Sequence, residues 1–161
     1  MARWFDLEPC DGDFVATAPY RYVYPIELPV APEEVWAGLT ADQPLKWCKL
    51  LSGGYTSDRP FGVGTTRTVK LARLLTLRER FDVWEEGRRH GFQVEQMNAP
   101  MFRRFAEDYL VEPTPVGCRF TWTFAFEPGT LTKPAGPLNR PINKVVYDSL
   151  VRDTSKHFGA R

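Results

Sequence analysis

The stretch CRFTWTFAF (residues 118–126) decides the fold. Aromatic side chains occupy every second position from 120 to 126, and Arg, Thr and Ala fill the positions between them. Successive side chains of a β-strand point to opposite faces of a sheet, so this alternation predicts a strand with one buried, aromatic face. A buried sheet face requires a second apolar layer to cover it. The rest of the chain must therefore supply further strands and a covering element.

The same period of two recurs earlier in the chain. A strand is expected at Tyr20–Val30 and a strand fragment near LLSGG (residues 50–54). Further strands are expected at Thr65–Leu71, Leu75–Glu85, His90–Gln96 and Phe102–Val111, which precede Cys118–Phe126. The last five are separated by short turn-like breaks. Short connections join antiparallel neighbours, so these segments predict an antiparallel meander.

Helical patterns complete the sequence. One helix begins at Pro32 with acidic residues in its first turn, and a second helical turn is expected around Pro44–Trp47. A longer helix is expected over residues 141–158, where one broad apolar face holds Ile142, Val146, Tyr147, Leu150, Val151 and Phe158. This face requires a partner, and the aromatic face of the sheet is the large apolar surface available.

Composition and charge narrow the class of protein. The 161 residues fit a single domain. The 21 Lys and Arg residues balance 20 Asp and Glu residues, which argues against nucleic-acid binding. No apolar run approaches the ~20 residues of a membrane-spanning helix, so no integral membrane contact is expected. The first residues lack the apolar core of a signal peptide, so the expected location is cytoplasmic.

Motifs for metals and cofactors are absent from the sequence. Cys10, Cys48 and Cys118 are widely spaced without a CxxC pair, and the only histidines are His90 and His157. No metal site or disulfide scaffold is therefore expected. The sequence also has no GxSxG, GxxxxGK[ST] or GxGxxG motif, so no cofactor is expected.

The order of the elements, together with four segments, resembles the helix-grip fold of the START/pollen-allergen superfamily, also called SRPBCC. The segments are ELPVAPEEVWAGL (27–39), LKWC (45–48), FGVGTTRTV (61–69) and RERFDVWEEGRR (78–89). The resemblance covers about residues 20–158 and is greatest to the polyketide cyclase/dehydrase and lipid-transport branch. It implies an α+β fold in which a curved antiparallel sheet of about seven strands wraps around a long C-terminal helix. Two short helices follow the first strand, and the sheet and long helix enclose a hydrophobic cavity.

The resemblance also suggests a boundary near residue 20. Residues 1–19 mix Gly, Pro, Asp and large aromatics without a clear period, so they are expected to form an N-terminal arm. Residues 20–161 are then expected to form a single helix-grip ligand-binding domain.

Strand register predicts which side chains share the inner face of the sheet. A hairpin that turns at residues 72–74 pairs Val69 with Leu77 and Arg67 with Glu79. Both charged side chains then face the interior, where they should form charge-assisted hydrogen bonds that lower the pKa of Glu79. An ordinary ion pair in water at the cavity mouth is the alternative.

Two further hairpins extend this face. They are expected to set Val83 beside His90, Phe81 beside Phe92, Tyr109 against Trp122 and Glu107 against Phe124, with Val94 and Gln96 following along the strand. The candidate ligand-binding residues are Arg67, Glu79, Phe81, His90, Phe92, Gln96, Glu107, Tyr109, Trp122, Phe124, Tyr147 and Leu150. His90 lies near a turn, so a solvated histidine is favoured over a catalytic base.

Three functions are compatible with these residues. The first is binding or carriage of an apolar small molecule such as a lipid, isoprenoid or polyketide-like compound. The second is a cyclase or dehydratase, in which Arg67 holds an enolate oxygen and Glu79 or Glu107 moves the proton. The third is a protein-interaction or quinone-chaperone module that uses the arm. The sequence leaves monomer and homodimer both open.

Overall fold

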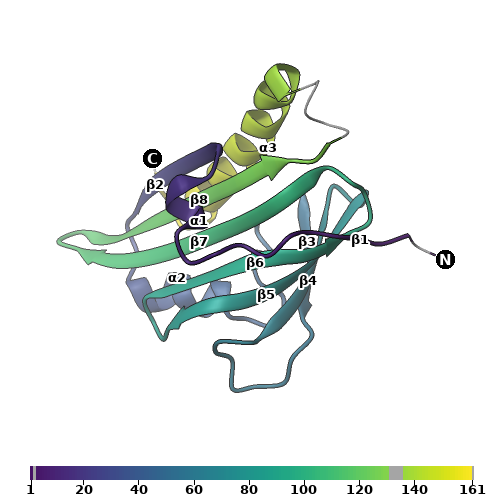
Figure 1. Ribbon diagram of the computed structural model, residues 1–161. Coiled ribbons are helices and arrows are strands. Elements are labelled where there is room, and N and C mark those ends of the chain that lie inside the picture. The colour runs from purple at the N-terminus through teal and green to yellow at the C-terminus, as the bar shows by residue number, and fades with distance from the viewer. Residues whose placement is uncertain (2, 131–135, 161) are drawn as a thin grey trace.

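The computed structural model of the chain describes residues 1, 3–130 and 136–160, with the backbone alone for 136–142. Its centre is an antiparallel sheet built from β2 (Tyr20–Leu28), β3 (Leu51–Tyr55), β4 (Thr66–Leu71), β5 (Leu75–Glu85), β6 (Arg89–Met97), β7 (Phe102–Thr114) and β8 (Gly117–Pro128). The strand order is β2-β8-β7-β6-β5-β4-β3, so consecutive strands from β3 to β8 are neighbours and the predicted meander is confirmed. The sheet is strongly curved (Figure 1).

Two helices lie on one side of this curved sheet: α2 (Pro32–Leu39) and α3 (Gly136–His157) (Figure 1). Tyr147, Leu150 and Phe158 of α3 belong to the same buried cluster as the aromatic side chains of β7 and β8. The long helix therefore covers the aromatic face of the sheet, as the sequence predicts. The fold is the helix-grip fold.

The start of one helix and the presence of another differ from the sequence prediction. Helix α3 begins at Gly136, and Pro137 falls in its first turn, where a missing N–H removes no intrahelical bond. The expected helix at Pro44–Trp47 is a series of turns, because Leu45 has a φ of 59°, which a right-handed helix does not allow. The side chain of Ile142, expected on the apolar face of α3, lies outside the described residues.

The N-terminal arm adds a strand to the sheet. Strand β1 (Phe5–Asp6) pairs with the end of β6, beyond the point where β6 is paired with β7 (Figure 1). The next residues bridge both strands: the backbone N–H of Leu7 donates to Glu95 on β6 at 2.9 Å, and that of Glu8 donates to Arg103 on β7 at 2.8 Å. The arm therefore fills a gap between β6 and β7.

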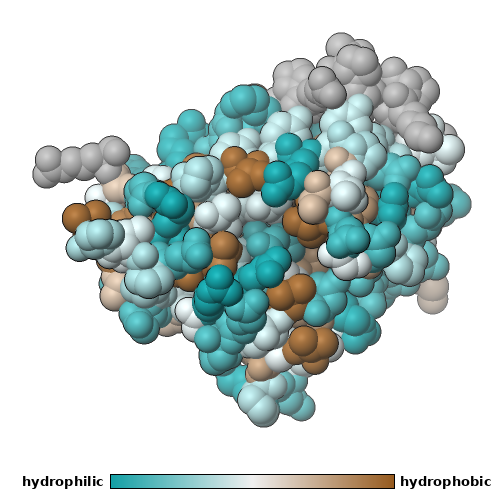
Figure 2. Space-filling view, turned by 60° about the vertical axis from the view of Figure 1, so that its left-hand side comes forward, coloured by the Kyte–Doolittle hydropathy of each residue, from teal (hydrophilic) through white to brown (hydrophobic). Residues whose placement is uncertain are grey.

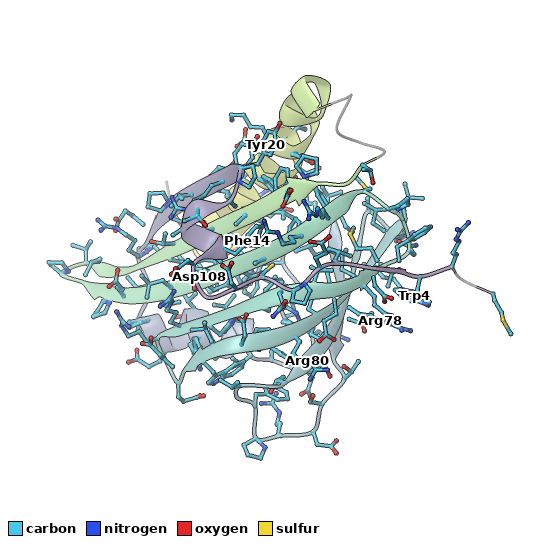
Figure 3. All side chains as sticks on the ribbon, in the orientation of Figure 1. Trp4, Phe14, Tyr20, Arg78, Arg80 and Asp108 are labelled. Atoms are coloured by element: carbon cyan, nitrogen blue, oxygen red, sulfur yellow. The ribbon has the colours of Figure 1, made fainter. Side chains whose placement is uncertain are left out.

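The arm also packs on the outer face of the sheet. Helix α1 (Phe14–Thr17) buries Phe14 against Ala106 and Ala125, whose small side chains leave room for the ring (Figure 3). At the other end of the arm, the guanidinium of Arg78 stacks over the ring of Trp4 at 3.7 Å.

The surface shown in Figure 2 is largely hydrophilic, with hydrophobic side chains in small separate groups. Across residues 1, 3–130 and 136–160, no helix combines the length and the hydropathy needed to cross a membrane.

Substitution of Leu150 tests the contact between α3 and the sheet. Leu150 is 3% exposed, so Leu150→Ala should lower the free energy of unfolding by ~2–5 kcal/mol in urea denaturation. Val145, on the same helix and 68% exposed, provides the control, and Val145→Ala should change stability by less than about 0.5 kcal/mol. A loss below about 1 kcal/mol for Leu150→Ala would show that this face of α3 is not packed.

Candidate functional site

A narrow cavity of about 80 Å³ lies between the inner face of the sheet and α3. Half-buried residues surround its mouth, among them Leu71, Leu75, Met101, Phe102, Asn143 and Val146. Buried residues of the central strands form its floor, namely Arg67, Glu79, Glu107, Tyr109, Trp122 and Phe124. Tyr147 and Leu150 contribute from α3. The cavity is therefore apolar around its mouth, with charged and polar groups confined to its floor.

Arg67 and Glu79 form the ionic part of the floor. They face each other on β4 and β5 in the predicted register, and Arg67 Nε donates to Glu79 Oε2 at 2.6 Å. Their side chains are 1% and 3% exposed, which excludes the alternative of a solvated pair at the mouth. Charge-assisted hydrogen bonds of this kind are among the strongest in proteins.

Aromatic rings surround the guanidinium of Arg67. Its Cζ lies 4.7 to 6.0 Å from the ring centroids of Phe92, Phe81, Tyr55 and Tyr109, a range at which cations are attracted to ring faces. Arg67 Nη1 is buried and has no hydrogen-bond partner among the described residues. The guanidinium thus keeps one donor atom uncommitted in a dry environment.

The pKa values of the pair reflect both burial and mutual attraction. Burial raises the pKa of Glu79, and the favourable charge of Arg67 only partly opposes this effect. The expected lowering of the Glu79 pKa is therefore wrong, because desolvation outweighs the ion pair. Burial lowers the pKa of Arg67, but the Glu79 carboxylate together with Tyr109 and Tyr55 outweighs burial, and the net pKa is raised. Arg67 therefore stays charged.

Glu107 provides a second carboxyl group at the floor. It faces Phe124 in the predicted register, and its Oε2 accepts a hydrogen bond from Trp122 Nε1 at 2.8 Å. Burial, followed by the charge of Glu79, raises the pKa of Glu107 to about 8, although the Trp122 hydrogen bond opposes the shift. At pH 7 Glu107 is therefore mainly a neutral carboxylic acid with a proton to donate.

His90 lies behind the floor and does not line the cavity. It is fully buried, with its ring 4.8 to 5.2 Å from the rings of Tyr109, Phe81, Trp36 and Trp84. Neither ring nitrogen has a hydrogen-bond partner among the described residues. Burial, and secondarily the charge of Arg67, lowers the pKa of His90 well below its ordinary value.

The preference for a solvated His90 is therefore wrong, and its predicted neighbour is wrong as well. The β5–β6 turn pairs Glu85 with Arg89, so that Trp84 rather than Val83 pairs with His90, and a β-bulge between Phe81 and Val83 then restores the predicted pairing of Phe81 with Phe92. Trp36 of α2 covers the histidine from the other side, and the indole N–H groups of Trp36 and Trp84 both donate to Glu86.

Gln96 does not belong to the site. A second register shift in the β5–β6 pair, between Arg78 and Glu79, turns Gln96 away from the inner face. Its side-chain amide donates to Asp6 of the arm at 2.7 Å, and Arg78 donates to its Oε1 at 2.8 Å. Met97 occupies the inner face instead and is 1% exposed.

The other predicted residues divide into two groups. Arg67, Glu79, Glu107, Tyr109, Trp122, Phe124, Tyr147 and Leu150 line the cavity, whereas Phe81 and Phe92 support Arg67 from behind. Several apolar lining residues are not among the predicted ones, including Leu45, Leu51, Met97, Met101, Phe102 and Phe105. The apolar Met101-Phe102 pair after Pro100 was a visible signal, because it follows a turn that the strand pattern had located.

No group of three or more potential ligands is placed to bind a metal ion within the part of the chain that the structure describes. The side chains that line the cavity offer hydrogen bonding, charge and proton transfer.

A double-mutant cycle tests the burial of the Arg67–Glu79 pair. Arg67→Met leaves a buried carboxylate without its partner and should cost ~3–5 kcal/mol of unfolding free energy. Arg67→Met combined with Glu79→Leu removes both charges and should be more stable than Arg67→Met alone. Additive effects of less than about 0.5 kcal/mol each, measured by urea denaturation, would mean that the pair is solvated.

The burial of neutral His90 predicts a loss of stability in acid. Because its pKa in the folded protein lies below 6.5, the unfolded chain takes up a proton first as the pH falls. Between about pH 7.5 and about pH 5.5 the wild type should lose about 1.4 kcal/mol more unfolding free energy than His90→Phe. Equal losses in the two proteins would show that His90 titrates normally in the folded state.

Comparison with known proteins places this geometry in a family. Residues 20–158 match the family model described as polyketide cyclase/dehydrase and lipid transport. An uncharacterized protein of Mycobacterium tuberculosis is 32% identical over 160 residues, which cover 96% of each chain.

Solved structures share the fold at low sequence identity. A START superfamily protein from Mycobacterium smegmatis has a TM-score of 0.71 and 8% identity, covering 86% of this chain and 97% of the other. Ginseng major latex-like protein 151 from Panax ginseng has a TM-score of 0.62 and 13% identity, with the same coverage of 86% and 97%. The match over residues 20–158 shows that the chain belongs to the polyketide cyclase/dehydrase and lipid transport family.

Proposed function

We propose that the protein binds an apolar small molecule in the cavity between the sheet and α3 and acts as its carrier. The observation that supports this proposal is that Arg67 lines an otherwise largely apolar cavity, while its Nη1 has no hydrogen-bond partner among the described residues. Ligand pockets combine apolar walls, which supply affinity, with a few polar groups that fix orientation. Lipid, isoprenoid and polyketide-like compounds all have the apolar body that such a cavity requires.

Energetics favour a ligand with a polar end directed at the floor. Apolar surface removed from water contributes roughly 25 cal/mol per Å². A buried donor without a partner costs about 1–3 kcal/mol, and an acceptor on the ligand would recover that cost at Arg67. Burial would therefore hold the ligand, and Arg67 would set its direction.

The dimensions of the cavity indicate how a ligand would enter. A volume of about 80 Å³ is well below the ~300–1000 Å³ of pockets that enclose drug-sized ligands. The half-buried side chains at the mouth, which include Phe102 of β7 and Val146 of α3, would therefore move outward on binding. The cytoplasmic location stays a prediction from the sequence, which leaves monomer and homodimer both open.

A second candidate function is that of a cyclase or dehydratase. Its support is Glu107, whose pKa of about 8 suits a group that donates and accepts protons near neutral pH. In such an enzyme Arg67 would stabilise an enolate oxygen while Glu107 moved the proton. The hypothesis of an interaction module gains less support, because part of the arm pairs with β6 and packs on the outer face.

Mass spectrometry of solvent extracts from protein purified without denaturation tests the carrier function. The wild type should release an apolar compound in near-stoichiometric amount. Arg67→Met should lose most of it, and so should Val146→Trp, which fills the mouth without touching the floor. The matched control is Arg80→Met in the same hairpin, because Arg80 is on the outer face and its side chain is 46% exposed (Figure 3).

The absence of any apolar compound from the wild-type extract would contradict the carrier function. Equal amounts in the wild type, Val146→Trp and Arg80→Met would contradict the location of the site. Turnover of a poly-β-ketone substrate by the wild type that is lost in Glu107→Gln would favour the enzyme instead.

A further inference from the structure

We infer that the cavity selects a ligand whose polar end is an uncharged oxygen acceptor, such as a ketone or ester carbonyl, and discriminates against a carboxylate of the same shape. This inference rests on the proposed binding function and names the ligand class for the same site. It follows from the charges and hydrogen-bond donors at the floor of the cavity.

The charges at the floor balance only when Glu107 is neutral. Arg67 and Glu79 neutralise each other across a distance of 2.6 Å. Within the described part of the chain no second cation lies beside Glu107, and its other neighbours are Trp122, Tyr109 and, on α3, Tyr147. A second carboxylate buried beside Glu79 is strongly disfavoured, so Glu107 holds its proton.

Two donors remain for a ligand at the floor. Glu79 Oε2 and Glu107 Oε2 already accept hydrogen bonds from Arg67 and Trp122. Arg67 Nη1 has N–H groups without a partner among the described residues, and the protonated carboxyl of Glu107 supplies an O–H. A carbonyl oxygen has two lone pairs and could accept from both donors.

The charge of the ligand decides between a carbonyl and a carboxylate. A neutral carbonyl leaves the floor with no net charge. A carboxylate would add a negative charge where Glu79 already compensates Arg67, and desolvation of an uncompensated charge is costly. The general preference of arginine for carboxylates is therefore already satisfied within the protein.

The same arrangement makes binding depend on pH. Ionisation of Glu107 removes a donor and places a negative charge beside the carbonyl oxygen. Affinity for a neutral carbonyl ligand should therefore be constant below the Glu107 pKa of about 8 and fall above it. The groups that face Glu107 are Glu79, Arg67, Tyr109, Trp122 and Tyr147, and the two tyrosines have raised pKa values that keep them neutral in this range.

Three probes of nearly one shape test the inference by calorimetry on the wild-type protein: 2-acetylnaphthalene, 2-naphthoate and 2-ethylnaphthalene. The series 2-dodecanone, dodecanoate and dodecane repeats the comparison on a flexible body. In the series whose body fits the cavity, the ketone should bind at least about tenfold more tightly than the carboxylate or the hydrocarbon. Its affinity should fall about tenfold between about pH 7 and about pH 9, as one linked proton requires.

Two variants identify the titrating group. Glu107→Gln keeps an uncharged side chain with a donor, so the pH dependence of ketone binding should flatten. The control Glu34→Gln, on the exposed side of α2, should retain it.

Each outcome distinguishes the inference from the proposed function. Binding of the hydrocarbon as tightly as the ketone, or of the carboxylate more tightly than the ketone, would overturn the inference while apolar binding stands. The same holds for a ketone affinity that does not change with pH. Failure of all six probes to bind would reject both the inference and the proposed function. The ranking of the probes on the wild-type protein decides between these outcomes, so no variant is needed.

Discussion

The burial of the Arg67 charge constrains the rest of this structure. A guanidinium that is 1% exposed requires a partner, which the β4–β5 register supplies as Glu79. The aromatic rings around it, including Phe81 and Phe92, exclude water and strengthen the pair. The same dry environment keeps Glu107 protonated. The ion pair is thus a consequence of one buried charge. Burial and the carboxylate of Glu79 keep Glu107 neutral, although Arg67 itself lowers the Glu107 pKa.

A carrier and an enzyme would use several of the same side chains in this cavity. Both need an apolar cavity and a donor that orients a polar end, and the family description joins cyclases, dehydrases and lipid transport. An enzyme also needs a group that changes its protonation during turnover, and Glu107 is suited to this because its pKa is about 8. A carrier uses the same proton only as a hydrogen-bond donor. The fold is therefore compatible with both functions, and the chemistry of the ligand determines whether the protein is a carrier or an enzyme.

Local sequence patterns predicted the parts of the site that depend on a single short turn. The turn at residues 72–74 sets Arg67 opposite Glu79 without further information. The register of the β5–β6 pair was harder to predict, because it shifts at two positions and the shift between Arg78 and Glu79 turns Gln96 outward. One extra residue in a strand hardly changes the local composition, so the sequence does not reveal where the register shifts. The burial of His90 was also hidden, since it depends on Trp36 from a helix distant in sequence.

A carbon-13 NMR titration of the glutamate carboxyl groups in the ligand-free protein tests whether Glu107 is a neutral acid. The resonance lost in Glu107→Gln should titrate near pH 8 in the wild type, where Glu107 is buried beside the Arg67–Glu79 pair. This midpoint should rise further when a neutral carbonyl ligand saturates the cavity. A midpoint for Glu107 near the ordinary glutamate value of about 4.3 would show that the floor holds two carboxylates and cannot favour a neutral ligand.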